Sequence, residues 1–419
     1  MPSLGGGAAD GLILAVFAAT YLGMALGRVP GLRTDRPAIA VIAAVIVIFA
    51  RGLDLPQAAR WVDLPTLALL FGLMVLSAQF AASGFYDACA ARITRARGGP
   101  GRLLAVTILA GGLLSAVLAN DIVAFAVTPL LCAGLAARRL NPLPFLIALA
   151  AACNVGSAAT MIGNPQNILI AQKGHLDFIY FLWACGVPSL IGLAVVQGVV
   201  MALWRGRWSL PESHRAPEAA ASVRIDRPVL TKALIAAAAL LIAFATALPR
   251  DVAALAIAAA LLVSRRITSR KLLGSVDWSL LILFSGLFVV TGAVAEMPAT
   301  QQVFRDLAAG GWLPDRLSVM VPAMLVASNS IGNVPAVILL LQLWPDAPAA
   351  ALYGLALLST LAGNLLLTGS LANLIVAERA IASGWSLPFL DHAKAGIPIT
   401  LLTTALAALW LWGVGLLPW

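Results

Sequence analysis

Long apolar blocks separated by short polar segments dominate the pattern of hydrophobic and polar positions along this chain. Most blocks are about 15–25 residues long, the length at which an α-helix crosses roughly 30 Å of hydrocarbon. The short alternating segments typical of a membrane β-barrel do not occur. The pattern therefore predicts an all-α polytopic membrane protein. Its apolar blocks lie at about 11–27, 37–50, 64–82, 103–137, 143–172, 180–204, 233–249, 252–263, 278–297, 318–344, 348–377 and 396–417.

Two of these blocks contain polar residues where lipid would surround a simple span. Asn120 and Asp121 interrupt the block at 103–137. The block at 318–344 is interrupted by Ser328, Asn329, Ser330, Gly332, Asn333 and Pro335. Each block can form either one broken crossing or a hairpin that enters and leaves the membrane on the same side.

The positions of arginine and lysine favour two re-entrant hairpins, because cytoplasmic loops collect basic residues. With two hairpins and an outside N-terminus, 21 of the 27 basic residues fall in inside loops. A single crossing at 103–137 would instead place the basic loops 92–102 and 138–139 on opposite faces. We therefore predict ten spans and two hairpins in a plasma (inner) membrane, with the N-terminus and the C-terminus outside.

Composition agrees with a membrane protein and excludes several other classes. Apolar residues make up 61% of the chain and charged residues 11%, against roughly 25% charged in an average soluble domain. The formal charge of +9 belongs to the loops, and no basic stretch is interleaved with aromatic residues as a nucleic-acid groove requires. No cysteine pair has C-x-x-C spacing, so we expect the cysteines to pack as small apolar residues. They are Cys89, Cys132, Cys153 and Cys185, and the histidines His175, His214 and His392 fall in predicted loops without an assigned role.

Enzyme chemistry has no visible site in the sequence. An intramembrane hydrolase would need paired carboxylates, an H-E-x-x-H motif, or a serine paired with histidine or lysine at membrane depth. None of these is present, and neither is a Walker motif for ATP. We therefore expect a protein that is not an enzyme and draws on an ion gradient.

The two halves of the chain repeat. Asp63 matches Asp277 at an offset of 214, Asn120 matches Asn329 at 209, and the segment Gly163–Asn167 matches 369–373 at 206. Each half contains five spans and one hairpin, and an odd number of spans makes the second copy upside down. Inverted repeats with interrupted helices at matching places are typical of secondary transporters.

These matches set the predicted domain boundaries. The first repeat covers 1–204, with a hairpin at about 103–137 and a broken helix at about 143–172. A cytoplasmic linker loop covers 205–232. The second repeat covers 233–419, with a hairpin at about 318–344 and a broken helix at about 348–377.

Four polar clusters lie in the two hairpins and the two broken helices. Unwound backbone cannot face lipid, so it must line a cavity. Exposed N–H groups at the start of a half-helix attract anions, and exposed C=O groups at its end attract cations. The candidate residues for substrate and coupling ion are Asn120, Asp121, Asn154, Thr160, Gly163, Asn164, Asn167, Ser328, Asn329, Asn333, Asn364, Thr368, Gly369, Ser370 and Asn373.

Asp121 is the only acid that the predicted topology leaves at membrane depth. An intramembrane carboxylate marks an ion or proton path by default, so Asp121 can carry a proton or bind sodium. The alternative is a structural cap on the second arm of the hairpin. No lysine or arginine can be placed at the breaks from the sequence. An anion would then rely on helix N-termini and on asparagine and serine side chains, which also leaves room for a neutral substrate.

At these residues the chain resembles the ion transporter superfamily. That group includes arsenite efflux pumps, citrate transporters, divalent anion/sodium symporters and NhaD-type sodium/proton antiporters. Asn120-Asp121 followed by Thr128-Pro129 resembles the first hairpin tip of the arsenite and NhaD-type branches. The other similar motifs are Gly163-Asn164-Pro165-Gln166-Asn167, Ser328-Asn329 with Asn333 and Pro335, and Gly369-Ser370-Leu371-Ala372-Asn373. The resemblance spans the whole chain and is strongest to the anion-permease members.

The resemblance implies a mobile transport domain that moves against a static scaffold in elevator-like alternating access. It implies a small anion or arsenite as substrate and a proton or sodium as coupling ion, with a NhaD-type sodium/proton antiporter as the alternative. No cofactor is expected apart from a sodium ion, and a homodimer is left open. By position, the sodium ligands and cation-side cluster are Asn120, Asp121, Asn154 and Asn167, and the other cluster is Asn329, Asn333, Asn364, Thr368 and Asn373.

Overall fold

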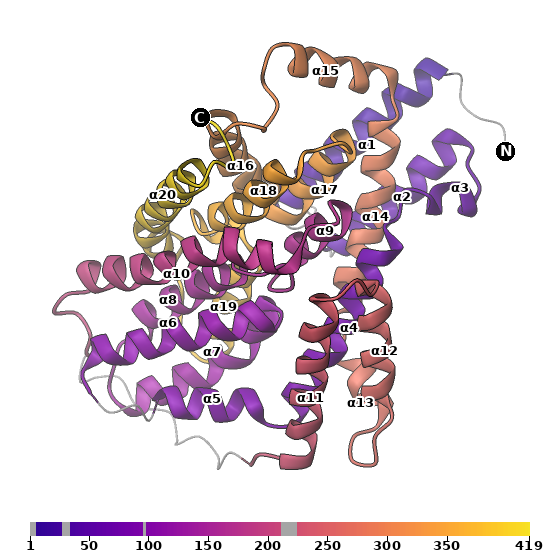
Figure 1. The fold of residues 1–419 in the computed structure, drawn as a ribbon. Helices are drawn as coiled ribbons and strands as arrows, with labels where there is room; N and C mark the ends of the chain where they lie inside the picture. Colours follow the sequence, from indigo (N-terminus) through magenta and orange to yellow (C-terminus); the bar gives the residue numbers. More distant parts are fainter. Residues whose placement is uncertain (1–5, 27–33, 95–97, 211–223) are drawn as a thin grey trace.

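The computed structural model describes residues 6–26, 34–94, 98–210 and 224–419 (Figure 1). Within these ranges every regular element is a helix, apart from one isolated bridge between Leu140 and Ser209. The all-α prediction is therefore confirmed.

Eight of the described helices are long and apolar enough to cross a membrane. They are α1 (Gly6–Leu26), α4 (Leu64–Ala82), α6 (Pro100–Val117), α7 (Asn120–Ala137), α10 (Phe178–Leu203), α11 (Arg227–Phe244), α14 (Trp278–Ala295) and α20 (Phe389–Gly413). The shorter helices within the predicted apolar blocks are α2 (Arg36–Arg51), α8 (Pro142–Ser157), α9 (Pro165–Lys173), α12 (Arg250–Leu262), α16 (Leu317–Ile331), α17 (Asn333–Leu343), α18 (Ala349–Ala362), η1 (Leu367–Gly369) and α19 (Leu371–Ala382).

Four short helices were not expected from the hydropathy pattern, because they contain no long apolar run. They are α3 (Leu55–Ala59), α5 (Phe85–Thr94), α13 (Ser269–Gly274) and α15 (Pro298–Ala309). The segment 211–223 of the predicted linker lies outside the described residues.

Each interrupted block is a pair of helices joined by a very short turn. Leu118 and Ala119 join α6 to α7, and Gly332 joins α16 to α17. Gly332 has φ of 91°, a left-handed value that favours glycine. The N–H of Asn120 donates to the carbonyl of Gly163 at 3.1 Å, which fixes the first tip against the break between α8 and α9. That the tips stop within the membrane remains a prediction.

Two close helix contacts recur at the predicted offset of 214. A Cβ at Gly72 on α4 would lie 2.7 Å from Ala254 on α12, and a Cβ at Gly286 on α14 would lie 2.7 Å from Ala40 on α2. Each half therefore packs one of its helices against a helix of the other half. These equal contacts support a duplicated unit, and its inverted orientation remains a prediction.

The helices form two groups in Figure 1. One group, drawn at the right, contains α1, α2, α4, α11, α12 and α14, and the other, drawn at the left, contains α6, α7, α8, α10 and α20. Helices α9 and α17 lie between the groups, where α9 contacts α4 and α17 contacts α14. The breaks and hairpin tips therefore face the α4–α14 pair.

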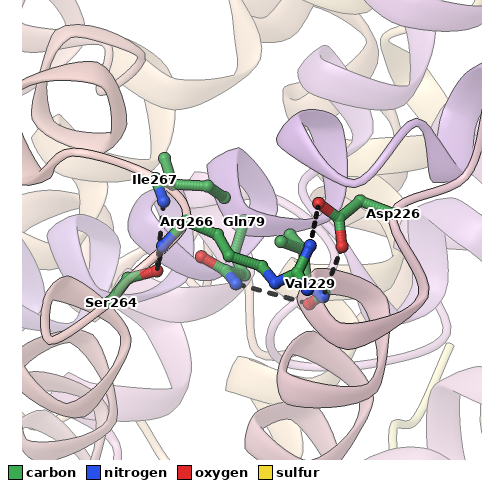
Figure 2. Close-up of polar contacts among 6 residues, drawn as sticks. All are labelled: Gln79, Asp226, Val229, Ser264, Arg266 and Ile267. Carbon is green, nitrogen blue, oxygen red and sulfur yellow. Dashed lines mark hydrogen bonds and ion pairs between the residues drawn. The ribbon is translucent and has the colours of Figure 1, made fainter.

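Polar contacts anchor the start of α11 to its neighbours (Figure 2). Asp226 caps α11 by accepting from the N–H of Val229 at 3.3 Å, and its other oxygen pairs with Arg266 at 3.4 Å. The buried amide of Gln79 on α4 donates to the carbonyl of Val229 at 3.3 Å. The start of α11 is thus held to both α4 and the segment before α13.

Candidate functional site

The first break separates α8 from α9 over residues 158–164. Asn164 caps α9 by accepting from the N–H of Asn167 at 2.9 Å, and Pro165 follows at the first helical position. Proline is favoured there because the N–H it lacks would have no partner within the helix. Gly163 has no space for a side chain, since a Cβ would collide with the backbone of Ser157. These residues stop one helix and start the next.

The second break separates α18 from α19 and contains the turn η1. Ser370 is the N-cap of α19 but makes no side-chain capping bond. The second hairpin closes this break. The amide of Asn329 donates to the carbonyl of Ala362 at 2.9 Å and accepts from the N–H of Leu366 at 3.2 Å. A Cβ at Gly369 would collide with the Asn329 side chain.

One asparagine in each break holds the unwound backbone in the same way. The Nδ2 of Asn167 donates to two carbonyls of its own break at 3.3 and 2.9 Å, and the Nδ2 of Asn373 does so at 2.9 and 3.2 Å. The accepting residues are Ser157 and Thr160 in the first break and Gly363 and Leu366 in the second. Each residue of the second set lies 206 positions after its counterpart in the first set. The same offset relates Gly163–Asn167 to 369–373.

Asn154 on α8 joins its own helix to the second break. Its Nδ2 donates to Oδ1 of Asn364 at 2.8 Å and to Oδ1 of Asn373 at 3.0 Å. Its Oδ1 accepts from the Ser370 hydroxyl at 2.8 Å and from Nδ2 of Asn120 at 3.4 Å. All five side chains are buried, so this network is closed to solvent.

Thr360 on α18 contacts the first break as Asn154 contacts the second. It follows Asn154 by 206 residues, the offset that relates the two breaks. Its hydroxyl accepts from Asn164 at 3.3 Å and from Gln166 at 3.0 Å. Its one hydrogen can go to the carbonyl of Ala356 at 2.8 Å or to Oδ1 of Asn167 at 3.3 Å. Neither Thr360 nor Gln166 was among the candidate residues, although Gln166 lies in the motif that includes Asn164 and Asn167. Each half therefore supplies a polar side chain to the break of the other half.

This arrangement differs from the predicted grouping of the candidates. Asn120 and Asn154 do meet, but Asn154 contacts Asn364 and Asn373 rather than Asn167. The cation-side cluster and the second cluster are therefore linked. A pattern along the sequence cannot show such an exchange, because the partners belong to opposite halves of the chain.

A first crevice, of about 40 Å³, lies between the first hairpin tip, the first break and helices α4 and α14. Asp121, Asn164 and Asp277 supply its polar lining. Asp277 is close enough to interact electrostatically with Asp121. The Oδ1 of Asn120 is buried and accepts no hydrogen bond from the described residues. Carboxylate and amide oxygens of this kind suit a hard cation.

The structure does not support the alternative role of Asp121 as a helix cap, because the N-cap of α7 is Ala119 and this helix end has no side-chain capping bond. A second acid, Asp277, lines the same crevice. Asp277 caps α14 by accepting from the N–H of Leu280 at 3.0 Å. Because Asp277 stands at the start of an apolar block, the hydropathy pattern places it in a loop and not in the site.

A second crevice, of about 20 Å³, lies between the second hairpin tip, the second break and helices α1, α2 and α14. It contains an arginine, Arg36, which could not be placed at the breaks from the sequence. Its lining includes Met24, Arg36, Leu280, Gly332, Asn333, Val334, Thr368, Gly369 and Ser370. Leu280 lines both crevices, so the first turn of α14 stands between them.

The remaining candidates stabilise the breaks or face the solvent. The Ser328 hydroxyl donates to the carbonyl of Ser359 at 3.3 Å. The Thr160 hydroxyl donates to the carbonyl of Ala116. The Oδ1 of Asn333 accepts from the N–H of Val334 at 3.0 Å. Thr368 is exposed.

His392 is buried in α20 rather than placed in a loop, with 1% of its surface exposed. It lies beside Gly396, which packs against the carbonyl of Asn364 in the second break. Neither ring nitrogen has a hydrogen-bond partner among the described residues.

Among the cysteines, Cys132, Cys153 and Cys185 are buried and unpaired, as expected for packing residues.

Comparison with known proteins finds matches to membrane proteins, including named transporters. A model of the citrate transporter family matches residues 13–351. The inner membrane protein YbiR of Escherichia coli is 31% identical over 76% of this chain and 80% of its own length. The silicon efflux transporter LSI3 of rice (Oryza sativa) is 28% identical over 90% of this chain and 92% of its own length.

A solved structure has the same fold. The crystal structure of the YdaH transporter of Alcanivorax borkumensis matches with a TM-score of 0.56 and 14% identity. The match covers 98% of this chain and 100% of that chain.

Proposed function

The chain belongs to the citrate transporter family of membrane proteins, and we propose that it is a secondary active transporter of a small anion, driven by a proton or sodium gradient. The substrate class is an inorganic oxyanion or a carboxylate, with arsenite as the neutral alternative. The observation that carries the proposal is the reciprocal contact between the halves, in which Asn154 binds the second break and Thr360 binds the first.

The physical argument starts from the broken helices. Each break places a helix N-terminus and backbone groups outside the regular helical pattern inside the protein, where such groups can replace the water shell of an ion. Asn167 and Asn373 hold these backbone groups in place. A site made in this way favours a charged substrate or ion and needs no bound cofactor. The candidate residues named from the sequence are part of this proposal.

The coupling ion would use the first crevice. Asp121 and Asp277 place two carboxylates there, and none of the described residues that line it is basic. Two nearby carboxylates repel each other unless a proton or a cation lies between them. Asp121 lies on the hairpin and Asp277 on α14, so movement of the hairpin against α14 would separate the two groups.

The size of the crevices supports movement during transport. At about 40 and 20 Å³ they hold little more than water molecules or a small ion. A carboxylate substrate would enter only when a hairpin moves away from α4 and α14. Elevator-like displacement of the hairpins and broken helices provides such an opening. The family and the relatives give no support to a NhaD-type sodium/proton antiporter.

The proposal is tested with purified protein in liposomes. We expect a labelled anion from a panel of citrate, succinate and phosphate to accumulate only when a proton or sodium gradient is imposed. An ionophore that collapses the effective gradient should stop accumulation at once. Equal uptake with and without every gradient would contradict secondary active transport and would indicate a passive channel.

The proposed orientation has its own test, in a cysteine-free background. Single cysteines at Arg102 and Arg139 should react with a membrane-impermeant maleimide only from the cytoplasmic side. Single cysteines at Arg316 and Asp346 should react only from outside. The two termini would then lie outside. Labelling of Arg102 and Arg139 positions from opposite sides would exclude the first hairpin and the inverted repeat with it.

A further inference from the structure

Arg36 occupies the junction of two spaces. It is the first residue of α2 and lines the second crevice. It also lines an open cleft of about 400 Å³. Thr368 is the other residue that lines both spaces. Arg36 and Thr368 therefore lie where the open cleft adjoins the second crevice.

The guanidinium of Arg36 has hydrogen-bond donors that no described residue uses. Its Nε donates to the carbonyl of Met24 at 3.2 Å, and no described residue accepts a hydrogen bond from its two Nη groups. No described carboxylate forms an ion pair with it. Asp35 is engaged as the cap of α2, accepting from Ala38 at 3.1 Å, and Glu378 across the cleft interacts with Arg36 only electrostatically. The planar fork of an arginine suits the two oxygens of a carboxylate or oxyanion.

The residues around Arg36 also favour a negatively charged ligand. The second crevice receives the N-terminal ends of α17 and α19, at Asn333 and Ser370. None of the described residues that line this crevice is acidic. The first crevice has the opposite character, with Asp121 and Asp277 and no basic lining residue among those described. The two crevices therefore differ in the charge of their lining, with Arg36 in the second and the carboxylates of Asp121 and Asp277 in the first, while Asp35 and Glu378 line only the open cleft.

We propose that Arg36 binds the substrate's negatively charged group at the entrance to the second break and so selects a carboxylate or an oxyanion over a neutral solute. This inference rests on the proposed transport function and narrows its substrate class. A neutral molecule such as arsenous acid would gain little from a guanidinium, whereas an anion gains paired, charge-assisted hydrogen bonds. Arg36 belongs to α2, which packs along α14, so it would recognise the substrate from outside the hairpins.

The test compares Arg36→Gln and Arg36→Lys with wild type. Arg51→Gln is the matched control, because Arg51 is on the same helix, lines neither crevice, and contacts Asp10 and the carbonyl of Ala293. Initial uptake into liposomes is measured for citrate, succinate, phosphate and arsenite, with size-exclusion profiles and thermal stability of each variant. We expect KM for the transported anion to rise by about tenfold or more in Arg36→Gln. Arg36→Lys should recover part of the affinity, and Arg51→Gln should behave as wild type.

Two results would overturn the inference. One is an unchanged KM for the anion in Arg36→Gln. The other is a wild-type protein that carries only neutral arsenite. Neither result would touch the proposed secondary active transport, which depends on the response to a gradient. Conversely, a wild type that equilibrates an anion without ever accumulating it would refute gradient coupling, and the KM of Arg36→Gln would still decide the role of Arg36.

Discussion

Replacing Asp121 by asparagine should abolish gradient-driven accumulation while the protein remains folded. In liposomes with an imposed gradient, the internal concentration of the labelled anion should rise only to the external concentration. Yield, size-exclusion profile and thermal stability should change little, because Asp121 makes no capping bond at α7. Exchange of labelled for unlabelled anion across the membrane should persist, since it needs no net ion movement.

The reason lies in the charge that asparagine removes. An amide keeps the shape of the carboxyl group but cannot release a proton, and it is a weaker ligand for a cation. The crevice would then hold Asp277 alone, without the second carboxylate that we propose to share the coupling ion. Asp277→Asn should reduce accumulation for the same reason, and α14 should stay capped because asparagine is as good an N-cap as aspartate.

Asp63→Asn is the matched control for both variants. Asp63 caps α4 as Asp277 caps α14, by accepting from Thr66 at 3.0 Å, but it pairs with Lys173 and lines neither crevice. We expect this variant to accumulate the anion normally. An Asp121→Asn protein that still accumulates its anion with unchanged proton and sodium dependence would rule out Asp121 as the coupling group.

The sequence was sufficient to predict the helical fold and the positions of its interruptions. Lipid solvates neither unwound backbone nor isolated polar side chains, so a polar cluster inside an apolar block indicates a local break. The structure indeed ends helices at Val117, Ser157, Ile331 and Ala362. The hydropathy pattern does not predict the short helices α3 and α15, because they lie outside the apolar blocks.

Besides Thr360 and Gln166, three titratable residues of the site region could not be predicted, for a common physical reason. Arg36, Asp277 and His392 all lie near the beginning of a helix, where a hydropathy pattern assigns charged and polar residues to a loop. Their positions depend on how distant helices pack. Arg36 and Asp277 each face a break because α2 and α14 lie against each other. Long-range packing of this kind leaves no periodic trace in the sequence.

Replacing Asn167 or Asn373 by alanine should abolish transport and lower the free energy of unfolding by about 1–3 kcal/mol, because each change removes two amide hydrogen bonds to the backbone carbonyls of its break. In Asn373→Ala the Asn154 amide also loses one of its two acceptors, whereas in Asn167→Ala the Thr360 hydroxyl keeps the carbonyl of Ala356. Thermal or denaturant unfolding in detergent and uptake into liposomes measure the two effects.

Asn141→Ala is the control for this pair, since Asn141 only caps α8 at the protein surface, accepting from Leu143 at 3.0 Å. It should cost about 1 kcal/mol and leave transport intact. The two site variants should resemble each other more than either resembles Asn141→Ala, because their side chains make the same three contacts at equivalent positions of the two halves. A loss confined to one of them would mean that only one break binds a transported species. Wild-type uptake in both would mean that the amides merely fill space between packed helices.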